Sequence, residues 1–132
     1  MQAMLEIHRI ELICLAGFMR VLSAEFVGRY PLRILNIHPS LLPAFPGLEA
    51  QAQALAYGVR VAGATVHFVD AGTDTGPIVD QRAVPVLPSD DADSVAARIL
   101  PIEHELYVSS VRRVLMGGWR LGGRAVSFPP GD

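Results

Sequence analysis

The chain has 132 residues with a hydrophobic fraction of 51%, a charged fraction of 18% and a mean hydropathy of +0.35, which fits one folded domain and excludes a disordered chain. Its 11 basic and 13 acidic side chains give a net charge of −2, which offers no broad positive field for nucleic acid. All the basic residues are arginines, so no mechanism here can use a lysine.

Cysteine content and apolar runs bear on the compartment. Cys14 is the only cysteine, which rules out an internal disulfide and a multi-cysteine zinc cluster and indicates a reducing environment. It lies in the longest apolar run, residues 12–19, which is far shorter than the roughly 20 residues of a membrane span. No basic region followed by an apolar block comes after Met1, so no secretory signal is predicted. We therefore expect a cytoplasmic protein without a membrane partner.

The first part of the chain alternates helices with strands. Residues 1–9 are predicted to form the last turns of a short helix, and residues 12–16 a buried parallel strand. Ser23 is expected to cap a short helix over residues 24–29, which ends before the second strand at residues 33–37. Strand, helix and strand in this order predict a parallel crossover.

The middle of the chain begins with a loop at residues 38–47, which is too rich in proline for regular structure. Residues 48–57 predict a helix that ends at Gly58. Two further strands, at residues 61–69 and 78–86, flank a polar turn, and this pattern predicts a hairpin.

The last helix begins at an acidic cluster, residues 90–93, because acidic groups suit a helix N-terminus. Its apolar residues recur at helical spacing, Pro101 is expected to kink it, and two glycines at positions 117 and 118 are expected to end it. The remaining tail is typical of a loose strand or arm. We therefore predict a catalytic domain at residues 1–116 and a C-terminal arm at residues 117–132.

Two polar side chains stand at the end of the second predicted strand. Because side chains alternate along a strand, Asn36 and His38 point to the same side, and Pro39 keeps His38 extended. In open α/β sheets ligands bind beyond the carboxyl ends of strands. An amide and an imidazole placed there suit oxyanion stabilisation and proton transfer. The alternative is structural, with Asn36 capping a turn and His38 satisfied within the loop.

The polar turn at residues 70–77 offers a carboxylate partner. Asp74 could orient the His38 imidazole and favour its charged form, or it could simply form an Asx turn. His67 alternates with apolar neighbours in its strand, which favours a buried structural histidine over a catalytic one. His8 and His104 are expected at the surface. No metal site is predicted, because no ligand-spaced cluster stands out.

A second interpretation of the same turn is an aspartic protease. Asp74-Thr75-Gly76 matches the active-site triplet of that class, and a chain of this length could be half of a dimeric enzyme. The triplet is short and common, however, and such proteases are nearly all β, whereas this sequence alternates helices and strands. The elements therefore favour a different enzyme class.

The residues singled out above lie in segments that resemble glycinamide ribonucleotide formyltransferases, also called phosphoribosylglycinamide formyltransferases, which are folate-dependent enzymes of purine biosynthesis. The resemblance extends to about Leu115. Related folate formyltransferases, including those that act on methionyl-tRNA or release formate, share the Asn, His and Asp pattern. The segments that carry the likeness are Leu15-Ala16-Gly17-Phe18-Met19-Arg20, residues 36–43, Ala64-Thr65-Val66-His67-Phe68-Val69 and Asp74-Thr75-Gly76-Pro77.

This resemblance implies an α/β fold with a Rossmann-like, mostly parallel sheet flanked by helices, and transfer of a formyl group from 10-formyltetrahydrofolate to the amine of glycinamide ribonucleotide. Asn36 and His38 would polarise the formyl oxygen and hold the tetrahedral intermediate, and Asp74 would keep His38 protonated. Glu103 would hold the sugar of the ribonucleotide. The implied folate-binding residues are Met19, Arg20, Val21, Leu22, Asp70, Ala71, Gly72 and Thr73.

The chain also departs from the family pattern. The first third of the family chain, with its initial strands and phosphate-binding loop, is missing, so the strand at residues 12–16 is expected at an exposed edge that could drive self-association. Pro101 lies two residues before Glu103, where a kink could turn that carboxylate away. Glu49-Ala50-Gln51 replaces polar, histidine-containing sequence. The alternatives to the implied function are therefore an inactive folate-binding fragment and a related folate formyltransferase or deformylase.

Overall fold

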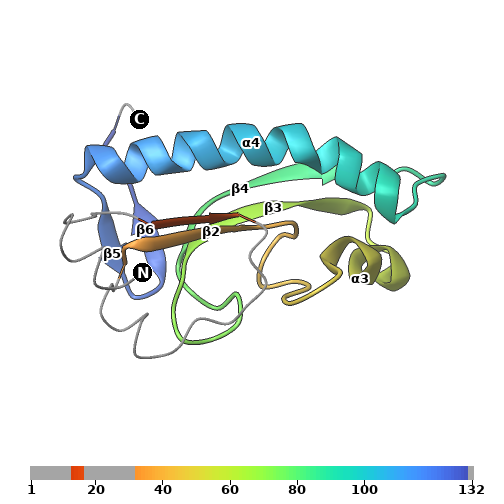
Figure 1. Cartoon of the computed structure of the whole chain (residues 1–132), viewed down its shortest axis with the longest axis horizontal. Coiled ribbons are helices and arrows are strands. Elements are labelled where there is room, and N and C mark those ends of the chain that lie inside the picture. The colour runs from red at the N-terminus through yellow and green to blue at the C-terminus, as the bar shows by residue number, and fades with distance from the viewer. Residues whose placement is uncertain (1–12, 17–31, 131–132) are drawn as a thin grey trace.

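The computed structural model describes residues 13–16 and 32–130, in which one sheet lies beneath a long helix (Figure 1). The two helices are α3 (Ala50–Tyr57) and α4 (Ala92–Met116). The sheet has six strands in the order β1-β2-β3-β4-β6-β5. These strands are β1 (Ile13–Ala16), β2 (Ile34–His38), β3 (Val61–Phe68), β4 (Ile78–Pro85), β5 (Arg120–Gly122) and β6 (Ala125–Ser127).

Strand directions make the described sheet mixed. β1 and β2 are parallel, as the sequence predicts, and β4 and β6 are also parallel. β3 pairs antiparallel with both β2 and β4, and β5 pairs antiparallel with β6. The α/β class is confirmed, but the sheet is not mostly parallel in this part of the chain, because a hairpin follows β2 where a crossover would have kept one direction. The predicted helices at residues 1–9 and 24–29 lie outside the described residues.

The elements between β2 and α4 form as predicted. α3 ends at Gly58, whose φ of +87° is the left-handed conformation that glycine adopts most readily. β3 and β4 form the predicted hairpin, with His67 opposite Ile78 at the end next to the turn. The hairpin matters for the site because its loop carries Asp74.

α4 is a 25-residue helix with well-defined ends. The Asp91 carboxylate accepts a hydrogen bond from the Ser94 amide at 2.8 Å, and the Ser94 hydroxyl accepts one from the Asp91 amide, which is a capping box. The helix is continuous through Pro101, and the kink expected there stays a prediction. The carbonyl that lacks its helical donor belongs to Ala97, which is exposed, so it can bind water. No helix of the described residues is long and apolar enough to span a membrane.

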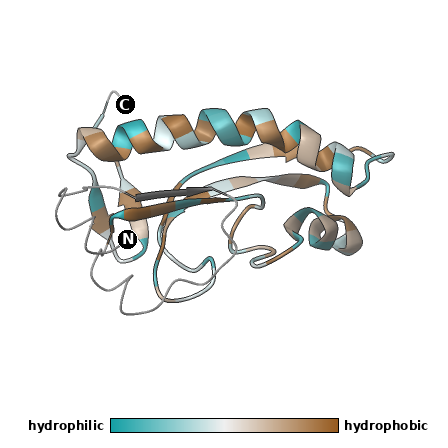
Figure 2. Ribbon diagram, viewed as in Figure 1, coloured by the Kyte–Doolittle hydropathy of each residue, from teal (hydrophilic) through white to brown (hydrophobic). Residues whose placement is uncertain are grey.

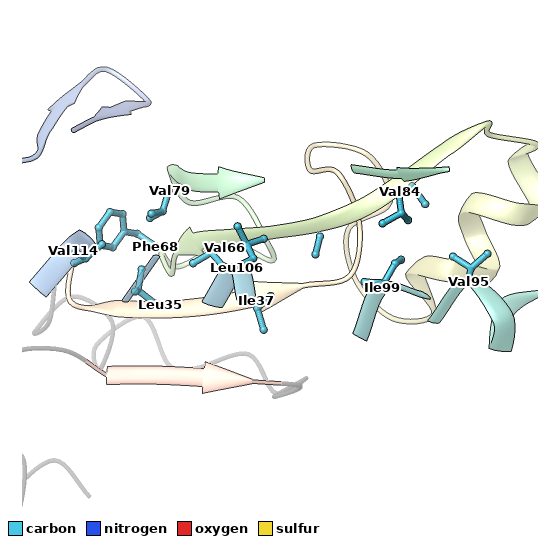
Figure 3. Packing of buried hydrophobic residues seen from close by; sticks show 12 residues of the cluster. Leu35, Ile37, Val66, Phe68, Val79, Val84, Val95, Ile99, Leu106 and Val114 are labelled. Atoms are coloured by element: carbon cyan, nitrogen blue, oxygen red, sulfur yellow. The ribbon is translucent and has the colours of Figure 1, made fainter. Parts of the chain in front are cut away.

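The core lies between α4 and one face of the sheet (Figure 3). Hydrophobic and hydrophilic bands alternate along α4 in Figure 2, as its amphipathic sequence predicts. Figure 3 shows Phe68 and Val114 toward one end of the core and Val95 toward the other. This cluster comprises Leu35, Ile37, Ala62, Ala64, Val66, Phe68, Val79, Val84, Val95, Ile99, Leu106 and Val114.

The C-terminal tail, expected to be a loose strand or arm, is part of the sheet instead. Residues 120–127 form a hairpin whose second strand, β6, pairs with β4. The indole of Trp119 lies 5.1 Å from the Phe68 ring, centroid to centroid, and thereby anchors the hairpin to the core. The division at residue 116 coincides with the end of α4 and stays a prediction.

Candidate functional site

The site lies on the face of the sheet opposite the core. β2 and β3 pair so that Asn36 is opposite His67 and His38 is opposite Thr65. Directly opposed residues point to the same side of a sheet, so these four polar side chains form one patch. Their neighbours in the two strands, such as Leu35 and Val66, point into the core. The alternation of side chains along two strands thus separates polar from apolar groups.

Asp74 brings the site together from the loop between β3 and β4. Its Oδ2 lies 3.5 Å from Nδ1 of His38, and its Oδ1 lies 3.5 Å from Nε2 of His67. The Gly47 amide donates a hydrogen bond to the same Oδ2 at 2.8 Å. Because the Asp74 side chain is only 11% exposed, its charge is poorly screened by water. The carboxylate therefore joins both histidines and the proline-rich loop.

The two ring nitrogens of His38 have different partners. Nε2 lies 2.8 Å from the carbonyl oxygen of Phe45, which can only accept a hydrogen bond, so Nε2 carries a hydrogen and donates it. Nδ1 faces the Asp74 carboxylate, which also accepts. A ring with a hydrogen on each nitrogen satisfies both contacts. His38 is thus a buried residue at the end of β2 that bonds to the loop, as the structural alternative predicts, and it is also a neighbour of Asp74.

His67 is the residue that sequence reasoning assigned to structure alone. Its Nδ1 lies 3.0 Å from the Phe68 carbonyl and its Nε2 lies 3.5 Å from Nδ2 of Asn36. Burial lowers the pKa of His67, and the Phe68 hydrogen bond and the Asp74 charge oppose that effect. A neutral ring that donates through Nδ1 presents Nε2 as an acceptor for the Asn36 amide. The strand pairing would have revealed this position, since Asn36 and His67 are opposite each other.

The proline-rich loop, residues 39–47, is held by a buried hydroxyl. Thr65, with no exposed surface, donates through Oγ1 to the Ser40 carbonyl at 2.6 Å and accepts from the Leu42 amide at 3.1 Å. Nε2 of Gln81 donates to Thr65 Oγ1 and to the Leu42 carbonyl, both at 2.9 Å. These bonds hold the loop against β3, and the Phe45 carbonyl of the loop holds His38.

The loop between β3 and β4, drawn in green in Figure 1, extends on the side away from α4. Oδ1 of Asp70 accepts from the Gly72 amide at 2.9 Å and from the Thr75 hydroxyl at 2.6 Å. The Asx turn therefore belongs to Asp70, and Asp74 is free to face the histidines. The other three predicted folate-side residues, at positions 71–73, are exposed in this turn.

Sequence and fold comparisons agree on one family. The formyl transferase family model matches residues 1–111. This chain belongs to the formyl transferase family. It is 51% identical over 121 residues to a phosphoribosylglycinamide formyltransferase of Mycobacterium tuberculosis, a match that covers 92% of this chain and 56% of that protein.

Solved structures extend the same result. The crystal structure of a phosphoribosylglycinamide formyltransferase from Anaplasma phagocytophilum matches with a TM-score of 0.94 and 45% identity over 99% of this chain and 65% of that one. A formyltetrahydrofolate deformylase from Pseudomonas syringae matches with a TM-score of 0.90 and 27% identity, over 96% of this chain and 43% of that one. The formyltransferase-type fold is thereby shown, and this chain spans less than two thirds of each of these relatives.

Of the remaining predicted residues of this formyl transferase chain, one lies on α4 and four lie outside the described part. Glu103 lies on α4, where burial raises the pKa of its carboxyl and the charges of His104 and His38 lower it to a smaller extent. Met19, Arg20, Val21 and Leu22 lie outside the described residues. Among the described residues, no group of three or more His, Cys, Asp or Glu side chains could hold a metal ion.

Proposed function

We propose that this chain transfers a formyl group from 10-formyltetrahydrofolate to the amine of glycinamide ribonucleotide. The observation that carries the proposal is an unsatisfied polar atom of the Asn36 carboxamide. Among the described residues its buried Oδ1 has no hydrogen-bond partner, although it lies beside His67 and near the Asp74 carboxylate. A buried acceptor without a partner costs about 1–3 kcal/mol, which an N–H of the ribonucleotide's amine would offset by donating to Oδ1. The names of the two transferase relatives supply the acceptor, and the name of the formyltetrahydrofolate deformylase supplies a folate that carries a formyl group.

The reaction joins the amine nitrogen to the formyl carbon and then breaks the bond from that carbon to N10 of the folate. Negative charge develops on the formyl oxygen, the amine loses a proton, and N10 gains one. His67 accepts one N–H of the Asn36 amide at 3.5 Å, so the second N–H can donate to the formyl oxygen. His38 donates from the end of β2 to the same oxygen once its Nε2 leaves the Phe45 carbonyl.

Asp74 acts on the proton and on the histidines. Its carboxylate lies 3.5 Å from a ring nitrogen of each histidine, so it can accept a hydrogen bond from His38 Nδ1 and orient that ring. Through water, the same carboxylate accepts the proton that the amine loses. The turn at residues 70–73, exposed at residues 71–73, and residues 19–22 contact the folate, and Glu103 binds the sugar of the ribonucleotide.

The second candidate is a folate-binding chain without transferase activity, or a related deformylase. The fold leaves a deformylase open, because a formyltetrahydrofolate deformylase of Pseudomonas syringae shares it. The identities favour the transferase, at 51% and 45% against 27%. Cytoplasmic location, lack of a nucleic-acid partner and self-association through the edge strand β1 stay predictions.

Isothermal calorimetry with a non-reactive folate analogue and with glycinamide ribonucleotide, followed by a formyl-transfer assay, tests the proposal. We expect binding of both compounds and production of the formylated ribonucleotide. Binding of the folate analogue alone would instead identify the silent module. Release of formate without the ribonucleotide would identify a deformylase, and binding of neither compound would overturn both candidates.

A further inference from the structure

The hairpin of β5 and β6 places a guanidinium beside the turn that carries Asp74. Arg124, in the turn of that hairpin, donates through Nη2 to the carbonyl oxygens of Thr75 and Gly76 at 2.6 and 3.2 Å. These residues directly follow Asp74. An arginine from the end of the chain thus contacts the backbone of a loop that belongs to the candidate site.

The hairpin itself is well anchored, so its tip has a fixed position. Ala125, next to Arg124, pairs with Ile78 at the start of β4. Trp119 packs against Phe68 before β5, and the guanidinium of Arg113 lies 4.0 Å from the ring centroid of Phe128 after β6. Arg124 is therefore held at the point where the loop returns to the sheet.

The loop needs such support because Asp74 has an unfavourable backbone conformation. Its φ of +55° is in the left-handed region, which residues other than glycine adopt only when their surroundings hold them there. The Asp70 side chain holds the turn from the amino-terminal side. On the carboxyl-terminal side, a Cβ at Gly76 would lie 1.7 Å from the Phe68 carbonyl oxygen, so the chain there is closely packed. Arg124 binds the carbonyls of Thr75 and Gly76, the two residues that follow Asp74.

We propose that Arg124 is a positioning residue, which holds residues 75–76 so that the Asp74 carboxylate stays between His38 and His67. Hydrogen bonds from a charged donor are stronger than neutral ones, and the planar guanidinium can serve neighbouring acceptors that a lysine ammonium serves less well. Arg124 lies beyond residue 111, where the family match ends. Its catalytic consequence rests on the proposed function, but its effect on the position of Asp74 does not.

Amide hydrogen exchange of Gly47 tests the inference without an activity assay, because this amide donates to Asp74 Oδ2. We compare Arg124→Met, which keeps an apolar stem, and Arg124→Lys, which keeps the charge. The matched control is Arg120→Met, at an exposed arginine of the same hairpin whose side chain makes no hydrogen bond or ion pair with the residues that the structure describes.

We expect Arg124→Met to speed Gly47 exchange by about three- to tenfold, the scale of one charge-assisted bond at an exposed position, with a smaller effect for Arg124→Lys. Amides of β3 and the Arg120→Met control should keep their rates. In the transfer assay kcat should fall by the same factor while KM for the ribonucleotide changes little.

Unchanged Gly47 exchange in Arg124→Met would overturn the inference. Equal acceleration in β3 would also overturn it, because it would mean a general loss of stability. Faster Gly47 exchange in a chain whose parent transfers no formyl group would support the inference and overturn only the proposed function.

Discussion

The two faces of β3 are made by one run of eight residues, yet they meet different physical requirements. Ala64, Val66 and Phe68 point to α4 and are buried among apolar side chains. Thr65 and His67, between them, are equally buried but hydrogen-bonded to loops and to Asn36. Burial alone therefore does not separate core from site in this protein. The chemistry of the contacting groups does separate them. We therefore expect substitutions on the core face to lower stability and substitutions on the site face to lower activity.

The largest effect is expected on the core face, at Phe68. This ring is fully buried and packs against Trp119, so Phe68→Ala should cost about 3–5 kcal/mol of unfolding free energy through the cavity that it leaves. Urea denaturation followed by circular dichroism measures the loss. Tyr57→Ala is the matched control, because that ring is 80% exposed. Equal stabilities of the two variants would contradict the assignment of Phe68 to the core.

On the site face, Asn36→Ala should change activity more than stability. Loss of one oxyanion donor typically raises the barrier by about 2.7–4 kcal/mol, so we expect kcat to fall about a hundred- to a thousandfold. Unfolding should change little, because the amide has an unpartnered oxygen and one long contact with His67. Steady-state formyl-transfer kinetics measure the effect, with Gln51→Ala on α3 as an amide control. A near-normal rate would remove Asn36 from the catalytic set.

Thr65 is expected to have a smaller effect, and on stability, because its hydroxyl is buried on the site face and holds the proline-rich loop. Thr65→Val keeps the shape but leaves the Leu42 amide and Ser40 carbonyl without their partner, which should cost about 1–3 kcal/mol of unfolding free energy. Thr65→Ser retains the hydroxyl and should recover most of the loss. Thermal unfolding of both variants separates the hydroxyl from the methyl group. If the valine variant proved as stable as the parent, the loop would have to be held by other contacts.

How far the sequence predicts this structure depends on whether a feature is local. The end of α3 at Gly58 and the start of α4 at Asp91 are set by nearby residues, and both were predictable. The expectation that Asn36 and His38 share one side of a strand also rested only on alternation. Strand direction did not follow in the same way, because the pairing of β3 between β2 and β4 depends on contacts far apart in the chain.

The same limit explains the site residues. Asp74 was identified as a partner for His38 from its residue type and place in a turn, and the structure brings the two together. His67 is predicted to be a buried structural histidine that faces away from its apolar strand neighbours, and it is buried and hydrogen-bonded. Only the register with β2 shows that it also faces Asn36. Arg124 had no signal at all in the sequence, since its contact with residues 75 and 76 is made by a hairpin joining the sheet.

Glu103 should show the smallest effect, with a sign opposite to the others. Burial raises the pKa of its carboxyl, so the folded state binds the proton more tightly than the unfolded state. Stability is then lost as pH rises from the unfolded value of 4.5 through the raised folded value, and at neutral pH the whole penalty is present. Glu103→Gln removes this penalty.

We therefore expect Glu103→Gln to be more stable than the parent at pH 7 and equal to it below pH 4.5, where both are neutral at this position. Glu105→Gln is the control, because that side chain is 68% exposed and pairs loosely with Arg82 at 3.7 Å, and it should bring no gain. Denaturation at a series of pH values measures the difference. A gain that persists at low pH would point to packing instead of charge. A gain in stability at pH 7 together with weaker ribonucleotide binding would show that this carboxylate binds the ligand and destabilises the fold.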